Sequence, residues 1–139
     1  MKKLLFLFVA TIISVATANA QKISVNKDVH DYGTIKRYAN GTCEFEVSNE
    51  GDQPLVISRC QGSCGCTVPE CPKVPIAPGS TEIITVKYDT KRIGSINKSV
   101  TIHSNDPDQP TKVVRIKGFI EDAPATETSP LNNTEGPRS

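Results

Sequence analysis

The chain has 139 residues, of which 37% are hydrophobic, 22% charged and 5% aromatic. This composition is typical of one soluble domain, being too polar for a bundle of membrane helices and too apolar for a fully disordered chain. Sixteen basic and fifteen acidic residues give a net charge of +1, which excludes a histone-like nucleic-acid binder, and the length excludes a large two-domain enzyme.

The first twenty residues have the pattern of a secretory signal peptide. Two lysines precede an almost unbroken apolar run over residues 4–15, and Ala-Asn-Ala at 18–20 has the small residues of a cleavage site. The run is shorter than the ~20 residues that a membrane-spanning helix needs. We therefore expect cleavage after Ala20, export to the periplasm or the medium, and no transmembrane segment in the mature chain.

Apolar and polar residues alternate along residues 21–121, whereas helical periodicity is absent. In residues 42–48, for example, Cys43, Phe45 and Val47 share one face. Short β-branched runs closed by turn residues predict an all-β fold, an antiparallel sandwich. The expected strands are residues 23–29, 42–48, 54–58, 81–88, 98–104 and 112–120. Other side chains expected on inward faces are Ile84, Val86, Tyr88, Val100, Ile102, Val114, Ile116 and Ile120.

These strands predict one domain over residues 21–121, followed by a tail. Residues 122–139 are rich in Pro, Thr, Asn and Ser and include one Leu. Such a segment buries too little apolar surface to offset its ordering entropy, so we predict that it is disordered. The domain is small enough for cross-links to matter to its stability, and export allows disulfides to form.

Four of the five cysteines fall within twelve residues, with the spacing C-x3-C-x-C-x4-C: Cys60, Cys64, Cys66 and Cys71. One or two structural disulfides are the first interpretation, and their pairing stays open. A bridge between the outer two cysteines would close the loop around the central pair. A bridge between the central two would need a tight bend at Gly65, which would make it easier to reduce. Cys43, on the core face, is the candidate for a buried free thiol.

Two other interpretations of these four cysteines also stay open. Together they could bind Zn²⁺ or Cu(I), although the spacing lacks the paired C-x2-C of common zinc sites. Alternatively, Cys64 and Cys66 could take part in thiol redox exchange, although no C-x-x-C is present at a helix start. Under the first interpretation no metal and no cofactor is expected.

No catalytic site is predicted. His30 and His103 are the only histidines, and isolated surface histidines are far commoner than catalytic ones. The chain has no glycine-rich phosphate loop, no H-E-x-x-H and no G-x-S-x-G. The acidic residues are expected on solvated outward strand faces. We therefore predict a protein that is not an enzyme.

Several segments resemble a bacterial exported family of unknown function, over about residues 23–120. They are D-Y-G-T-I at 31–35, F-E-V-S-N-E-G-D-Q-P-L-V-I at 45–57 and S-C-G-C-T-V-P at 63–69. That family is similar to Hydin-like and major-sperm-protein-like immunoglobulin domains, and the resemblance implies an immunoglobulin-like sandwich of about seven strands. The family usually has an aromatic residue in place of Cys71, which favours an extra local cross-link here. Related domains act mostly as docking modules.

Loops carry recognition on a rigid sandwich, and an open sheet edge can accept an added strand. The function predicted from the sequence is therefore a protein-interaction or scaffolding module of the bacterial cell envelope, with an unknown protein partner and no nucleic acid. A thiolate metal-binding protein and a thiol-redox protein are the alternatives. The residues expected to contact the partner are Gln61, Gly62, Ser63, Gly65, Thr67 and Pro69.

Overall fold

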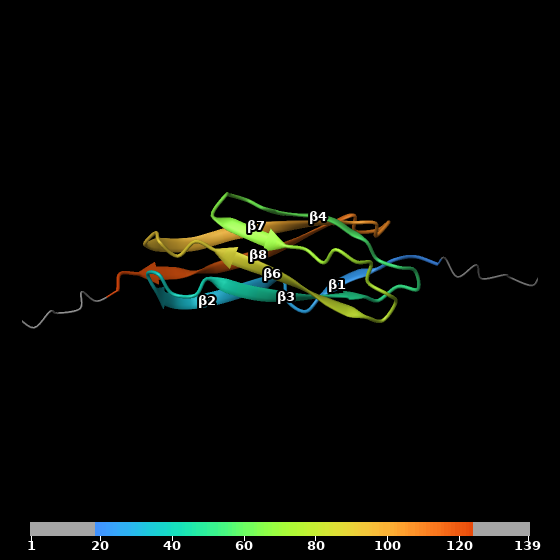
Figure 1. The fold of residues 1–139 in the computed structure, drawn as a ribbon, viewed down its shortest axis with the longest axis horizontal. Helices are drawn as coiled ribbons and strands as arrows, with labels where there is room; N and C mark the ends of the chain where they lie inside the picture. Colours follow the sequence, from blue (N-terminus) through green and yellow to red (C-terminus); the bar gives the residue numbers. More distant parts are fainter. Residues whose placement is uncertain (1–18, 124–139) are drawn as a thin grey trace, which may run out of the picture.

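The computed structural model describes residues 19–123, which form two facing β-sheets and contain no helix. The molecule is elongated, and the described chain enters at one end and leaves at the other (Figure 1). The predicted leader and tail lie almost entirely outside the described residues. The strands are β1 (Ile23–Val25), β2 (Val29–Lys36), β3 (Thr42–Asn49), β4 (Ile57–Gly62), β5 (Thr67–Glu70), β6 (Thr81–Tyr88), β7 (Gly94–Ser104) and β8 (Thr111–Glu121).

Each sheet has four strands. The first sheet has the order β1-β3-β6-β5, and the second sheet has the order β2-β8-β7-β4. Neighbouring strands are antiparallel, except that β2 pairs with β8 in parallel. The all-β, immunoglobulin-like sandwich predicted from the sequence is confirmed, with eight strands in place of about seven and with this one parallel pair.

The prediction of a single opening strand over residues 23–29 is wrong. The chain changes sheets after β1, so that β1 pairs with β3 in the first sheet and β2 pairs with β8 in the second. The chain leaves the first sheet at Asn26. The backbone N–H of Asn26 donates to the Glu46 carbonyl at 3.0 Å, and its side-chain oxygen accepts from the Glu46 N–H at 3.1 Å. The sequence pattern does not reveal such a change, since β1 has only three residues and none of the eight residues of β2 is fully buried.

Two further strands differ from the prediction, both around the cysteine segment. The strand expected at 54–58 begins only at Ile57, and Leu55 makes an isolated bridge with Ile76 instead. Residues 67–70, expected to be loop, form β5. This strand has four residues and includes Pro69, which a sheet tolerates because β5 is an edge strand.

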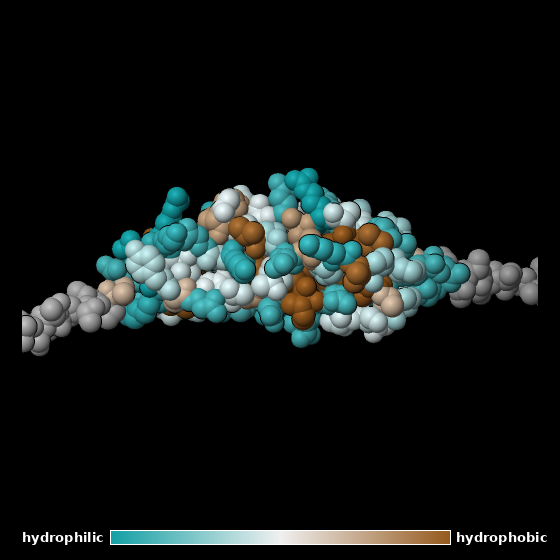
Figure 2. Space-filling view, viewed as in Figure 1, coloured by the Kyte–Doolittle hydropathy of each residue, from teal (hydrophilic) through white to brown (hydrophobic). Residues whose placement is uncertain are grey.

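The core lies between the two sheets and is built from the inward faces of the strands. The faces predicted for β3, β6, β7 and β8 are confirmed, with only Tyr88 among their members left half-buried. The face of the molecule seen in Figure 2 consists mostly of hydrophilic and intermediate residues, with smaller hydrophobic patches among them. The side chains that are fully buried are Phe45, Leu55, Ile76, Ile84, Ile96, Ile102, Ile116, Ile120, Val47, Val86, Val100 and Val114.

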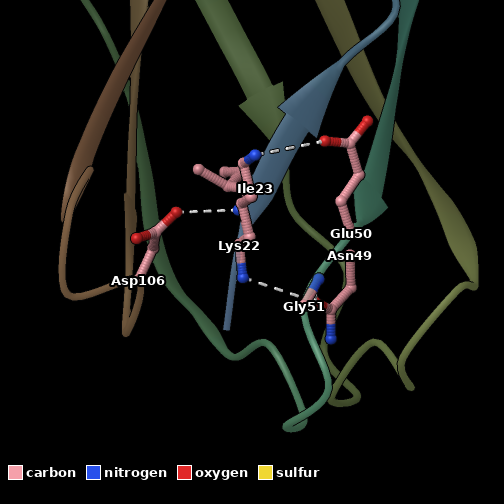
Figure 3. Close-up of polar contacts among 6 residues, drawn as sticks. All are labelled: Lys22, Ile23, Asn49, Glu50, Gly51 and Asp106. Carbon is pink, nitrogen blue, oxygen red and sulfur yellow. Dashed lines mark hydrogen bonds and ion pairs between the residues drawn. The ribbon is translucent and has the colours of Figure 1, made fainter. Parts of the chain in front are cut away.

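Asp106, in the loop between β7 and β8, ties β1 to the second sheet (Figure 3). This side chain is 1% exposed, so the expectation that acidic residues lie on solvated faces is wrong here. Its carboxylate accepts hydrogen bonds from the backbone N–H groups of Ile23 and Asp108 at 2.8 Å and of Gln109 at 3.0 Å. Burial raises the pKa of Asp106, but these donors outweigh burial and hold the pKa below its ordinary value.

Asn49, at the end of β3, is the second buried polar side chain at this end (Figure 3). Its amide oxygen accepts from the N–H groups of Gly51 at 2.9 Å and Lys22 at 3.4 Å. Its amide nitrogen donates to the carbonyls of Gln53 at 2.6 Å and Ile76 at 2.9 Å. Together, Asn49 and Asp106 provide hydrogen-bond partners for backbone groups at and beside β1, which has only three residues.

Candidate functional site

The disulfide between Cys60 and Cys71 joins the two sheets at one side of the sandwich. Cys60 lies on β4, the edge of the second sheet, and Cys71 directly follows β5, the edge of the first sheet. Their Cα atoms are 5.9 Å apart, and eleven positions separate them in the chain. Both half-cystines pack against the core, so this bridge holds two edge strands that share no ladder of hydrogen bonds.

The second disulfide, between Cys64 and Cys66, lies in the turn from β4 to β5. The two positions are separated by two in the chain, with Cα atoms 5.2 Å apart. The turn is fixed on both sides. Ser63 exchanges hydrogen bonds with the Ser99 backbone on β7, and the Cys66 carbonyl accepts from the Asp89 N–H at 2.9 Å. The bridge is therefore partly exposed on an ordered turn.

Thr67 places a buried hydroxyl against this second disulfide. Its residue is 2% exposed, and its oxygen lies 3.5 Å from Cys64 Sγ and 3.8 Å from Cys66 Sγ. A disulfide sulfur carries no hydrogen, so the hydroxyl is the donor. The prediction that Thr67 belongs to the partner-contacting loop is wrong, because β5 turns this side chain inward. Alternation gave no signal for this, because the apolar neighbour Val68 is the exposed residue, at 57%.

The remaining residues of the predicted contact loop are divided between strands and turn. Gln61 and Gly62 end β4, Ser63 and Gly65 lie in the turn, and Pro69 lies on β5. Gln61, Ser63 and Gly65 are exposed. Gly62 is instead required for packing, since a Cβ there would meet the Thr67 carbonyl oxygen at 2.0 Å.

A shallow pocket of about 340 Å³ opens beside the Cys64–Cys66 bridge. Its lining contains both half-cystines and Gly65, with one acidic and one basic side chain, Asp89 and Arg92. The Asp89 carboxylate accepts a hydrogen bond from the Lys91 N–H at 3.0 Å, and Arg92 is exposed. The pocket therefore opens onto two partly exposed half-cystines and has a basic residue in its lining.

A larger groove, of about 630 Å³, runs beside the Cys60–Cys71 bridge between the two edge strands. Ile57, the bridge itself and two prolines supply its apolar part, and Arg59, Glu70 and Lys73 supply its charges. The lining residues are Ile57, Ser58, Arg59, Cys60, Pro69, Glu70, Cys71, Pro72 and Lys73. The groove and the pocket share no residue.

Cys43 is the free cysteine, and it is 5% exposed inside the core on β3. Burial raises the pKa of its thiol, although the neighbouring Tyr32 hydroxyl and the Lys27 charge act in the opposite direction. The Tyr32 hydroxyl donates to the Gly41 carbonyl at 2.7 Å. A buried thiol that stays protonated is a poor nucleophile and packs as a small apolar side chain.

The two histidines lie on different strands of the second sheet, and His103, on β7, is opposite Arg59 of β4. His30 lies on β2 and contacts Tyr32 edge to face, with Lys27 Nζ 3.1 Å from its Nδ1. Burial, followed by the Lys27 charge, lowers the pKa of His30, while Asp31 acts in the opposite direction. Within residues 19–123, no group of three His, Cys, Asp or Glu side chains is placed to hold a metal ion, and no helix is suited to cross a membrane.

The fold is shared with proteins of distant sequence. A Porphyromonas gingivalis W83 protein of unknown function is 18% identical with a TM-score of 0.65; the match covers 78% of this chain and 51% of that protein. The ASH/PapD-like domain 7 of human CEP192 is 8% identical with a TM-score of 0.58, over 81% of this chain and 94% of that domain.

A third similar structure is the CsuC–CsuE chaperone–tip adhesion subunit pre-assembly complex of Acinetobacter baumannii. It is 8% identical with a TM-score of 0.51, over 72% of this chain and 57% of the matched chain. This chain therefore spans about half the length of the first and the third of these proteins. No curated protein matches its sequence.

The sequence itself matches one family model, which covers the whole sandwich from β1 into β8. The matched region is residues 23–120, and it contains both disulfides, the groove and the pocket. Because this region is well over half of the chain, the protein belongs to the family described as Protein of unknown function (DUF1573).

Proposed function

We propose that this protein is an exported, non-enzymatic interaction module of the bacterial cell envelope, which binds an extended segment of another protein along β4. The observation that carries the proposal is the groove of about 630 Å³ beside an edge strand with an unpaired side. An extended segment would add a strand to the second sheet and place alternate side chains in the groove.

The backbone of β4 is suited to this addition. Its partner in the second sheet is β7, and no other strand of residues 19–123 pairs with it. Residues 57–62 make no backbone hydrogen bond outside that ladder. Alternate N–H and C=O groups of β4 therefore point away from β7, as unpaired edges do. The adjacent edge strand, β5, is less suited because Pro69 has no N–H to donate.

The chemistry of the groove indicates the kind of segment that fits. Ile57, the Cys60–Cys71 bridge and Pro72 offer an apolar surface, which suits an aliphatic or aromatic side chain. Arg59 and Lys73 outnumber Glu70 at the rim, so an acidic residue beside the apolar one would be favoured. We therefore expect an extended segment in which apolar and acidic residues alternate.

Export is supported by two observations on this chain. The first is the small-residue site before Gln21, and the second is that four of the five cysteines form disulfides, which persist in oxidising compartments. Among the similar folds, the Acinetobacter structure is described as a chaperone–tip adhesion subunit pre-assembly complex, and another, SfaE, as a periplasmic chaperone. These likenesses agree with a binding role outside the cytoplasm.

A selected peptide tests the proposal. We would select binders to the purified, oxidised protein from a displayed library of unstructured heptapeptides and synthesise the strongest. Calorimetry is expected to show binding, and amide hydrogen exchange is expected to slow in residues 57–61. Reversing the charges with Arg59→Glu and Lys73→Glu is expected to weaken binding of an acidic peptide at least about tenfold, by removing the complementary rim.

The matched control is Lys87→Glu, because Lys87 is an exposed lysine on β6 outside the groove. This variant is expected to bind the peptide as the wild type does. The proposal fails if no peptide slows exchange in β4, if protection appears on β2 instead, or if Lys87→Glu weakens binding as much as the rim variants.

A further inference from the structure

We propose that the Cys64–Cys66 bridge is a thiol-exchange site, which oxidises a pair of cysteine thiols on an extended protein segment. The geometry points to this site because a partly exposed disulfide opens onto a pocket, with a buried hydroxyl aimed at both sulfur atoms. The inference does not rest on binding along β4, since the pocket and the groove have no residue in common.

The two disulfides differ in what they do for the fold. Cys60–Cys71 joins two sheets and packs against the core, so its loss would separate edge strands. Cys64–Cys66 closes a ring of three residues within one turn, and it joins no elements. Short rings restrict the unfolded chain least, so the second bridge contributes less to stability. It can open and close while β4 and β5 stay in place.

The Thr67 hydroxyl is placed to stabilise the sulfur that leaves when the Cys64–Cys66 bridge opens. A buried hydroxyl normally has a partner, and the side-chain atoms within hydrogen-bond distance of this one are the two sulfur atoms. When the bridge breaks, a thiolate forms where a neutral sulfur was, and the hydrogen bond from Thr67 becomes charge-assisted and stronger. The hydroxyl is nearer to Cys64 Sγ, so we assign Cys64 as the sulfur that leaves.

The pocket supplies access and charge. Arg92 lines the same pocket as the two half-cystines, and a cation there favours both the incoming thiolate and the thiolate that leaves. Asp89 opposes this effect, but its carboxylate is engaged by the Lys91 N–H. Apart from its two chain neighbours, no residue has an atom within 4 Å of the position that a Cβ of Gly65 would occupy, so the turn is open on that side.

The exchange has two steps, and its electrons balance. A partner thiolate attacks Cys66 Sγ, the Cys64–Cys66 bond breaks, and its electron pair goes to Cys64 Sγ, which Thr67 stabilises and water protonates. The partner's second thiolate then attacks the partner sulfur of the mixed disulfide, and Cys66 leaves as a thiolate. The partner dithiol loses two electrons to become a disulfide, and the two cysteines of this protein gain them. The reaction is stoichiometric, one partner pair for each bridge.

A redox titration separates the two bridges. The purified, oxidised protein is equilibrated in glutathione buffers of increasing reducing strength, alkylated under denaturing conditions and weighed by mass spectrometry. Cys43 takes one label throughout, and each opened bridge adds two. We expect a plateau at three labels, mapped to Cys64 and Cys66, before the Cys60–Cys71 bridge opens. A single step to five labels, or prior opening of Cys60–Cys71, would overturn the proposal.

A kinetic comparison tests the role of Thr67. A synthetic extended peptide with two reduced cysteines is mixed with oxidised protein, and formation of the peptide disulfide is followed by chromatography. Thr67→Val, which keeps the shape and removes the donor, is expected to slow exchange at least about tenfold, while Thr67→Ser restores the rate to within about twofold. Equal rates for these two variants would remove Thr67 from the mechanism.

A comparison with an isolated peptide shows whether the fold of the protein speeds thiol exchange. The isolated oxidised peptide S-C-G-C-T-V-P carries the same ring without the buried hydroxyl or Arg92. The folded protein is expected to exchange faster than this peptide, and the variant Cys64→Ala/Cys66→Ala is expected to produce no peptide disulfide. If the free peptide exchanges as fast as the protein, the bridge is only a labile bond, and the site we propose does not exist.

Discussion

Replacing Asp106 with alanine should lower the free energy of unfolding by about 3 kcal/mol. The carboxylate accepts three backbone N–H groups, and the Ile23 N–H lies in the buried part of the molecule, where water cannot replace the lost acceptor. β1 has three residues and pairs only with β3, so this bond is a large part of what holds it. Urea unfolding followed by circular dichroism measures the loss, and amide exchange is expected to locate it at β1.

The neighbouring Asp108 provides the matched control. It lies in the same loop and is exposed, so Asp108→Ala should change stability by less than about 0.5 kcal/mol. If both variants lose the same amount, the loop as a whole matters and the Asp106 carboxylate has no special role.

The effect of Asp106 also depends on pH, with a sign that follows from its lowered pKa. A carboxyl group whose pKa is lower in the folded state stabilises the protein above its ordinary value of 3.8, and that contribution is lost as the pH falls through the folded value. The difference in unfolding free energy between wild type and Asp106→Ala should therefore be constant near neutral pH and shrink below about pH 4. A difference that grows in acid would contradict this assignment.

The strands of the central part of the chain could be predicted because each buries one face. Phe45 and Val47 on β3, and Ile84 and Val86 on β6, alternate with polar residues, and the period of two places every second side chain in the core. The predicted strand at 23–29 combined β1 with the first residue of β2 and left out the rest of β2, which has no buried residue and so carries a weak pattern. β5 was missed because four residues with a proline carry too weak a pattern.

The sequence predicted which segment carries the candidate site, but not how its residues are arranged in space. Local clustering pointed to Cys60, Cys64, Cys66 and Cys71, but their pairing depends on which strands lie side by side across the sandwich, and the sequence does not record that. The buried position of Thr67 has the same origin, since it follows from β5 pairing with β6. Asp106 was assigned to solvent because one of the N–H groups that donate to its carboxylate belongs to Ile23 on β1, which is distant in the chain.

Both edges of the first sheet are tied to the second sheet, by different chemistry. At β1 the tie is the Asp106 carboxylate, and at β5 it is the Cys60–Cys71 bridge. In the middle of the sandwich the buried core holds the two sheets together. At its two sides the sheets are joined by the Asp106 hydrogen bond and the Cys60–Cys71 disulfide. The side with the covalent tie also carries the groove, so the bridge holds the binding surface that we propose.

Removing the Cys60–Cys71 bridge should therefore be the more costly of the two disulfide deletions. Cys60→Ala/Cys71→Ala is expected to lower the free energy of unfolding by about 3 kcal/mol, because the bridge closes a loop of twelve residues in the unfolded chain. Cys64→Ala/Cys66→Ala removes a much smaller ring and should lower the free energy of unfolding by about 1.5 kcal/mol. Urea unfolding under non-reducing conditions measures both.

The same pair of variants distinguishes a structural bridge from a reactive one. Without Cys60–Cys71, amide exchange should quicken in β4 and β5, and a peptide selected for the groove should bind more weakly, because the edge strands lose their covalent link. Without Cys64–Cys66, both properties should stay close to wild type while thiol exchange disappears. Cys43→Ala controls for the loss of a cysteine as such, since it breaks no bridge. Equal losses of stability and binding in the two double variants would mean that the cysteine segment acts as one structural unit.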